Sequence, residues 1–134
     1  MSKSETGKQG EDIAAKYLMD RGYQVIDRNF REKWGELDII VIAPDKTLVF
    51  VEVKTIEYQT SEFEQEQANL LTPEDNLTKS KLTKLQRTAS LYANDHHKLI
   101  DDAKGWQIDF ISVRVFAGKH PSDKKIDIRH FENI

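Results

Sequence analysis

The stretch LVFVEVKTI, Leu48 to Ile56, has the composition of a β-strand but carries two charges. β-Branched and aromatic residues dominate it, as is typical of strands. Glu52 and Lys54 interrupt its apolar end. Because side chains alternate along a strand, Phe50, Glu52 and Lys54 share one face, and the three valines share the other. The strand therefore places a carboxylate and an amine together at one end of an apolar face.

The preceding segment, ELDIIVIA at Glu36 to Ala43, is predicted to be the other strand of a hairpin. Across a three-residue loop, Ile40 is expected to lie opposite Phe50. The next pair on that face is then Asp38 opposite Glu52. The simplest register thus brings two carboxylates together beside a lysine.

Two opposed carboxylates repel each other, by roughly 4 kcal/mol at ~4 Å and an effective dielectric constant of about 20. A cation must offset this repulsion. Lys54 supplies one positive charge, whereas a divalent ion supplies two, and carboxylate oxygens are ligands that suit Mg²⁺ or Mn²⁺. Two interpretations remain open: a metal site, or a structural ion-pair cluster of Asp38, Glu52 and Lys54.

A third carboxylate, Glu11, is expected on the first helix. It precedes Ala14, Ala15 and Leu18 by three, four and seven residues, so it lies near the buried stripe of that helix. Glu11 is therefore a further candidate metal ligand. An acid that is favoured only by the helix dipole is the alternative.

The pattern along the chain indicates an α/β fold with a mixed central sheet flanked by helices. Hydrophobic periodicity and turn residues place the elements in the order α-β-β-β-α-β-β. We predict helices over 7–21 and 77–94, and strands over 23–30, 36–43, 47–54, 107–116 and 125–131. The length of 134 residues suits a single domain, 1–134.

Composition narrows the class of protein. Charged residues make up 32% and hydrophobic residues 38%, and there is no cysteine, which excludes a disulfide framework and a thiolate metal site. The sequence shows neither a secretory leader nor a membrane span, so we expect a cytoplasmic protein without a membrane partner. The net charge of −3 speaks against a nucleic-acid partner unless the charges are unevenly distributed.

The charges are indeed uneven. A polar, acidic excursion at about 57–76 contains no lysine or arginine. A basic group follows it on the predicted second helix, formed by Lys79, Lys81, Lys84 and Arg87. This group is a candidate phosphate-binding face, and a solvated helix face is the alternative reading.

Three further residues are candidates for roles near the site. Arg31 and Trp34 lie on the segment that leads into Asp38, where they would stack on a base or anchor the loop. Asp109 sits inside an apolar strand. We expect it to be an acid that forms hydrogen bonds at a strand end; a residue that supports the metal ligands is the less favoured alternative.

The stretches GELDII and FVEVK resemble the core of the PD-(D/E)xK, or restriction-endonuclease-like, nucleases. Asp38 matches the aspartate of that motif, and Glu52-Val53-Lys54 matches its (D/E)xK triplet. The chain is most similar to an uncharacterised bacterial family of predicted endonucleases related to Holliday-junction resolvases. Three stretches carry this similarity and cover most of the chain: GKQGEDIAAKYLMDRGYQVIDRNFR, WGELDIIVIAPDKTLVFVEVKT and PEDNLTKSKLTKLQRTASLYA.

The resemblance implies a restriction-endonuclease-like three-layer core and a role for each site residue. Asp38, Glu52 and Glu11 would bind Mg²⁺ or Mn²⁺ together with the carbonyl of Val53. Lys54 would orient or deprotonate the attacking water, or stabilise the pentavalent phosphorane. Lys81 would face the phosphate backbone.

The implied activity is metal-dependent hydrolysis of DNA, including branched or flap DNA, and resolvases suggest a homodimer. This chain departs from the family pattern at Thr55-Ile56, where an arginine usually follows the catalytic lysine. An inactive nucleic-acid-binding module of the same fold is therefore the alternative function.

Overall fold

The computed structural model describes residues 2–59 and 73–134. These residues form a mixed α/β fold whose elements follow the predicted order. Three short 3₁₀ helices, η1 to η3, lie between the main elements. In chain order the elements are α1 (Lys3–Asp20), β1 (Gln24–Glu32), β2 (Gly35–Ile42), β3 (Leu48–Gln59), η1 (Pro73–Asn76), α3 (Lys79–Asp95), η2 (His97–Leu99), β4 (Trp106–Ala117), η3 (Pro121–Asp123) and β5 (Lys125–Phe131).

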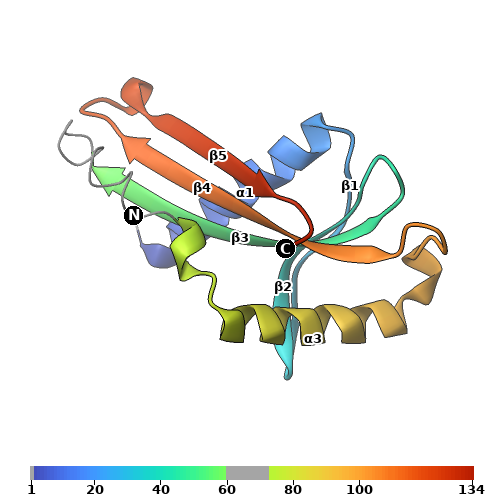
Figure 1. Cartoon of the computed structure of the whole chain (residues 1–134). Coiled ribbons are helices and arrows are strands. Elements are labelled where there is room, and N and C mark those ends of the chain that lie inside the picture. The colour runs from blue at the N-terminus through green and yellow to red at the C-terminus, as the bar shows by residue number, and fades with distance from the viewer. Residues whose placement is uncertain (1, 60–72) are drawn as a thin grey trace.

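In the described part of the chain, the five strands form one mixed sheet in the order β1-β2-β3-β4-β5. Neighbouring strands are antiparallel except β3 and β4, which run parallel. A parallel pair needs a crossover, and the chain from η1 through α3 supplies it. Figure 1 shows the long β3 and β4 side by side with β5, and β2 turning away from them.

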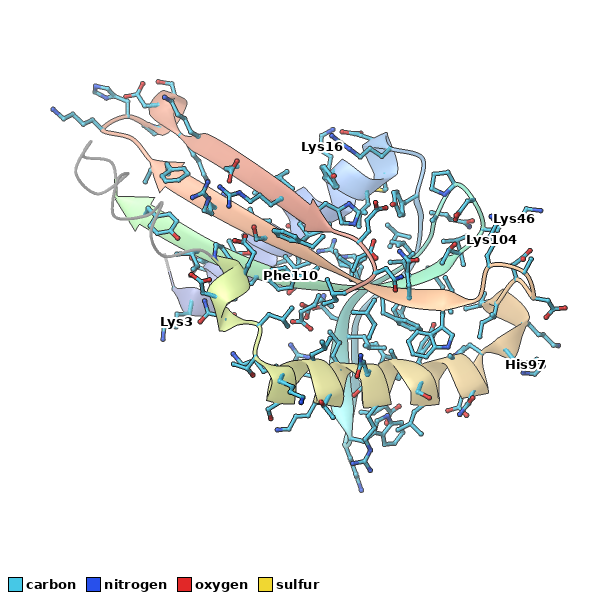
Figure 2. The ribbon with its side chains drawn as sticks, viewed as in Figure 1. Lys3, Lys16, Lys46, His97, Lys104 and Phe110 are labelled. Atoms are coloured by element: carbon cyan, nitrogen blue, oxygen red, sulfur yellow. The ribbon has the colours of Figure 1, made fainter. Side chains whose placement is uncertain are left out.

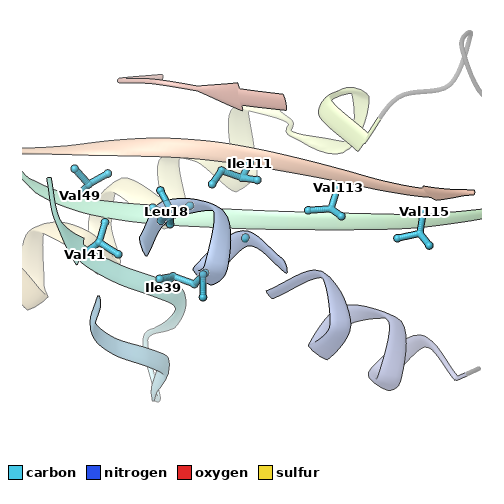
Figure 3. Packing of buried hydrophobic residues seen from close by; sticks show 10 residues of the cluster. Leu18, Ile39, Val41, Val49, Ile111, Val113 and Val115 are labelled. Carbon is cyan, nitrogen blue, oxygen red and sulfur yellow. The ribbon is translucent and has the colours of Figure 1, made fainter. Parts of the chain in front are cut away.

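The helices α1 and α3 cover opposite faces of the sheet (Figure 1). Leu18 of α1 packs on alternate strand residues such as Val49 and Ile111 (Figure 3). Leu85 of α3 packs on Phe50 and others of the opposite face. Because successive side chains of a strand point to opposite faces, a continuous apolar run such as β3 feeds both cores. None of the helices in the described ranges is long and apolar enough to cross a membrane.

The hairpin predicted from the alternating pattern is confirmed. Ile40 lies opposite Phe50 and Ile42 opposite Leu48, in antiparallel register. The turn is closed by hydrogen bonds between Ala43 and the end of the loop, and Lys46 adopts a positive φ of 77°.

Helix α1 begins four residues before the predicted start at Gly7. Ser2 caps it, because its side-chain oxygen accepts a hydrogen bond from the N–H of Glu5 at 3.1 Å. Helix α3 begins at Lys79 instead of Leu77, because Thr78 takes the same capping position toward Lys81. Local capping chemistry thus outweighed the glycine and periodicity signals used to place these boundaries.

The acidic excursion is shorter than predicted at both ends. Residues 57–59 belong to β3, which pairs with β4 as far as Gln59 opposite Ala117. Residues 73–76 form η1, where Pro73 is buried and Glu74 lies 3.7 Å from Arg129. The remainder, 60–72, lies outside the described residues. Tertiary pairing, which local composition does not reveal, accounts for both differences.

Helix α1 approaches the sheet closely at Gly10. A Cβ atom at this position would overlap the side chain of Thr55 on β3. Glycine therefore lets the helix backbone lie directly on the strand. Since Glu11 is the next residue, this contact also fixes where that carboxylate stands.

We predict that Gly10→Ala destabilises the protein by about 1–3 kcal/mol, because the added methyl group forces the helix off Thr55. Urea unfolding monitored by circular dichroism measures the loss. Gly7→Ala is the matched control: nothing lies within 4 Å of a Cβ there, and alanine favours a helix by ~1 kcal/mol over glycine. Equal effects of the two substitutions would contradict the proposed close contact.

Candidate active site

The candidate site lies where β2 separates from β3. The ladder between these strands ends at the pair Ile39–Val51. One residue further, the Oδ2 atom of Asp38 accepts the hydrogen bond of the Val53 N–H at 2.9 Å. On the other side of β2, Asn29 of β1 adopts a positive φ of 55°. A side chain thus replaces the main-chain partner of Val53 and holds the two strands at their point of divergence.

The Val53 carbonyl faces the same opening. In an extended strand the N–H and C=O of one residue point to the same side. Since the Val53 N–H points at Asp38, its C=O also points toward β2 and lies beyond the last pair of the ladder. This carbonyl is therefore a donor oxygen beside the Asp38 carboxylate.

Three carboxylates from three different elements line one cavity at this opening. Asp38 comes from β2, Glu52 from β3 and Glu11 from α1. The cavity has a volume of about 780 Å³ and also contains Lys54 and Lys81. The structure thus brings together all four residues predicted to be catalytic, and it adds one lysine of the basic helix.

Burial and neighbouring negative charge raise the pKa values of two of these carboxylates. Burial, followed by the charge of Asp38, raises the pKa of Glu52 from its ordinary 4.5 to about 9. Burial and then the charge of Asp38 also raise the pKa of Glu11. Both shifts mean that ionising these carboxylates is costly where they lie, and a cation that enters the cavity would reduce this cost.

The three carboxylates have no direct ion-pair partner among the described residues. Within residues 2–59 and 73–134, none of the ion pairs involves Glu11, Asp38 or Glu52. Lys54 is exposed and forms no ion pair with either neighbouring carboxylate in the described ranges, which weighs against the interpretation as a structural ion-pair cluster. The Oε1 atom of Glu11 is buried without a hydrogen-bond partner. Hard oxygen donors in this state fit a divalent cation such as Mg²⁺ or Mn²⁺.

Arg28 of β1 is a neighbour that the sequence did not reveal. Its guanidinium donates to Asp12 at 2.7 Å, and its charge acts against the rise in the pKa of Glu11. Arg28 therefore reduces the negative potential at Glu11. A single arginine on an outer strand carries no local signal of such a role.

The predicted nucleic-acid-binding residues separate into two groups. Lys81 and Lys84 line cavities at the site, whereas Lys79 and Arg87 are exposed on α3 and line neither cavity. Arg31 is exposed and lies 4.0 Å from Glu36.

Trp34, with Lys84, lines a second cavity of about 320 Å³, which shares Glu52, Lys54 and Lys81 with the first.

Asp109 lies outside this site, in agreement with the favoured reading of a hydrogen-bonding acid. It is fully buried and accepts hydrogen bonds from Gln107, from the N–H of Asn133 and from His130, the last at 2.7 Å. His130 carried no signal in the sequence because its partner is on another strand. The imidazole of His130 and the carboxylates of Asp109 and Glu132 place potential ligand atoms near enough for a metal site, but both oxygens of Asp109 already accept these hydrogen bonds.

Comparison with known proteins places the chain among bacterial relatives. The family model described as "Uncharacterised protein family UPF0102" matches residues 10–113, which include Glu11, Asp38, Glu52, Lys54 and Lys81. A UPF0102 protein of Syntrophomonas wolfei is 34% identical over 115 residues, covering 86% of this chain and 89% of the relative. A UPF0102 protein of Mycobacterium bovis is 33% identical over an alignment of 138 residues, covering 100% of this chain and 94% of the relative.

A further UPF0102 protein, from Alkaliphilus oremlandii, is 32% identical over 127 residues, covering 95% of this chain and 94% of the relative. The matches span nearly the full length of both partners and include the strand pair and both helices that build the cavity. The chain therefore belongs to the family UPF0102.

Proposed function

We propose that this protein is a metal-dependent nuclease that hydrolyses phosphodiester bonds in DNA, built on a restriction-endonuclease-like fold. The observation that carries the proposal is the group of three carboxylates, Glu11, Asp38 and Glu52, around one cavity, none of which forms an ion pair with another described residue. A fold gains no stability from such a cluster unless a ligand offsets its charge.

The three carboxylates and the Val53 carbonyl would hold Mg²⁺ or Mn²⁺. When bound, such an ion supplies Lewis-acid stabilisation to a phosphate and lowers the pKa of water. The residues come from α1, β2 and β3, so the folded chain preorganises them. The 2.9 Å hydrogen bond from the Val53 N–H to Asp38 would fix the orientation of one of these ligands.

Lys54 would supply the positive charge that the reaction itself needs. It lines both cavities beside Glu52, and in this structure it is free of ion pairs within the described residues. An ammonium in this position stabilises negative charge that develops on the phosphate and orients the attacking water. A lysine bound in a structural ion pair could not serve this purpose without first breaking that pair.

The lysines at the start of α3 favour a nucleic-acid substrate. Lys81 lines the carboxylate cavity and Lys84 lines the adjoining one, and both add positive charge to a chain whose net charge is −3. The phosphate backbone of a nucleic acid would contact these lysines and continue to the carboxylate site.

A catalytically inactive nucleic-acid-binding module is the second candidate. The observation that favours it is Thr55-Ile56, where the resemblance leads us to expect an arginine. Thr55 instead packs against Gly10, so the position serves helix docking. Cleavage assays on single-stranded, duplex, flap and four-way DNA with Mg²⁺ or Mn²⁺ distinguish the two functions.

We predict that Lys54→Ala lowers the cleavage rate by at least about 100-fold while metal binding is kept or tightened. The reason is that the substitution removes charge stabilisation from the reaction but deepens the negative potential felt by the cation. Glu52→Ala should instead lose metal binding and cleavage together. Calorimetric titration with Mn²⁺ and a gel-based cleavage assay measure the two properties.

Lys104→Ala is the matched control for Lys54→Ala, because Lys104 is an exposed lysine at the opposite end of β3 and β4 (Figure 2). It should cleave like the parent. A Lys54→Ala protein that also cleaves like the parent contradicts the role assigned to that lysine.

We predict that the metal-free protein loses stability as the pH rises from about 5 to about 8.5. The folded-state pKa of Glu52, about 9, lies above its ordinary 4.5, so protonation stabilises the fold at low pH and this contribution is lost as the pH approaches 9. Because Glu52 is partly exposed, the loss is roughly 2 kcal/mol, well below the full shift. Urea unfolding at each pH measures it.

Two comparisons isolate Glu52 as the cause. Glu52→Gln, which does not ionise, should flatten the pH dependence, and Mn²⁺ should stabilise the parent more at the higher pH than at the lower. An unchanged slope in the Glu52→Gln protein would show that other groups set the pH dependence.

A further inference from the structure

A second cavity opens on the α3 side of the sheet, beside the carboxylate site. Its volume is about 320 Å³, at the small end of the range for ligand pockets. Four aromatic and aliphatic side chains contribute to its wall, namely Trp34, Leu77, Leu85 and Phe110. Phe110 lies on β4 above the first half of α3 (Figure 2). The wall therefore suits a flat, apolar group of modest size.

Trp34 offers an open aromatic surface in this cavity. Its side chain is 44% exposed, which is high for the largest apolar residue type. Among residues 2–59 and 73–134, no ring or guanidinium stacks on it. The ring face is thus available for stacking by a ligand.

The segment that carries Trp34 is held in place. The hydroxyl of Thr88 on α3 lies 3.5 Å from the Trp34 carbonyl. A Cβ atom at Gly35 would overlap Thr88, so the start of β2 rests directly on the helix. A platform fixed in this way loses little entropy when a ligand binds.

Charged and polar groups surround the apolar wall. Lys54, Lys81 and Lys84 line the cavity, and Lys54, Lys81 and Glu52 also line the carboxylate site. Asn76 adds an amide that both donates and accepts hydrogen bonds. Glu36 is the opposing charge, and it lies 4.0 Å from Arg31. The arrangement joins an apolar slot, a hydrogen-bonding group and anion-binding lysines.

We propose that this cavity binds an unpaired nucleobase of the DNA strand whose phosphate lies at the carboxylate site. The base stacks on Trp34, and the phosphates on either side contact Lys54, Lys81 and Lys84. Base stacking on an aromatic side chain tolerates every base, because each has a π-face. This inference rests on the proposed nuclease function and names its substrate class: DNA with an unpaired nucleotide at the cleavage position.

Continuous duplex DNA is a poorer substrate under this proposal. A paired base must first leave the stack before it reaches the cavity, at a cost in free energy that an already unpaired base avoids. Flaps, branch points and single strands therefore bind and react better than intact duplex. The preference arises from the cavity wall and is separate from the chemistry at Glu52 and Asp38.

The test measures binding without cleavage. Oligothymidylate of roughly eight nucleotides and a backbone of the same length with abasic sugars are titrated into the protein in EDTA. Trp106→Phe removes the other tryptophan, so the fluorescence reports Trp34 alone. We expect oligothymidylate to quench Trp34 and to bind about tenfold more tightly than the abasic chain. Equal affinities overturn the proposal, since phosphate contacts alone would then account for binding.

Two variants locate the base. Trp34→Ala, followed by anisotropy of a labelled oligonucleotide, should abolish the difference between the two chains, whereas Trp34→Phe should keep most of it. Leu77→Trp, which fills the cavity without removing Trp34, should also abolish it and thereby excludes a mere folding defect of Trp34→Ala. A base-dependent difference that survives in Leu77→Trp places the base elsewhere and overturns the proposal.

Cleavage assays separate this inference from the proposed function. If the protein prefers oligothymidylate but cleaves none of the DNA substrates in the presence of Mg²⁺ or Mn²⁺, the result supports the base site and contradicts the nuclease function. Cleavage of continuous duplex as fast as flap DNA, with equal binding of the abasic chain, supports the nuclease and overturns the base site.

Discussion

The separation of β2 from β3 is the constraint on which the site depends. Beyond Ile39 and Val51 the main-chain ladder stops, and the Asp38 carboxylate takes over the Val53 N–H at 2.9 Å. Because the Asp38 side chain replaces a main-chain acceptor, the partly buried N–H of Val53 is not left unpaired. It also opens the space into which Glu52 and the Val53 carbonyl face. A continuous hairpin would close that space.

The two helices complete the site from opposite faces of the sheet. On one side, the absence of a side chain at Gly10 brings α1 against Thr55 and sets Glu11 in the cavity. On the other side, α3 brings Lys81 to the same opening and supports the start of β2 through Thr88. Negative and positive groups thus reach the cavity from separate layers, which suits a site that must hold both a cation and a phosphate.

Much of the site could be predicted because the relative positions of its residues follow from short-range sequence patterns. Period-two alternation and a short turn fix a hairpin register, so Asp38 and Glu52 were expected as neighbours, and helix periodicity placed Glu11 near them. Features that depend on partners distant in the sequence could not be predicted. The bond between Asp109 and His130 spans 21 residues, and Arg28 acts on Glu11 from another element.

The ends of the strands and the interactions of Lys54 could not be predicted from local sequence either, because they too depend on residues distant in the sequence. β3 continues to Gln59 because β4 pairs with it, and that partner lies nearly sixty residues further along the chain. The sequence also left two partners open for Asp38 and Glu52, a lysine or a metal ion. In the structure Lys54 has no ion pair in the described ranges, which weighs against the first and which composition alone does not show.

Anomalous diffraction from crystals grown with Mn²⁺ tests the central claim most directly, because it locates the ion without reference to any substrate. The account predicts one strong peak within bonding distance, about 2.0–2.3 Å, of carboxylate oxygens of Asp38 and Glu52, with the Val53 carbonyl in the same shell. A cavity without a peak, or a peak only at Asp109, His130 and Glu132, would contradict it.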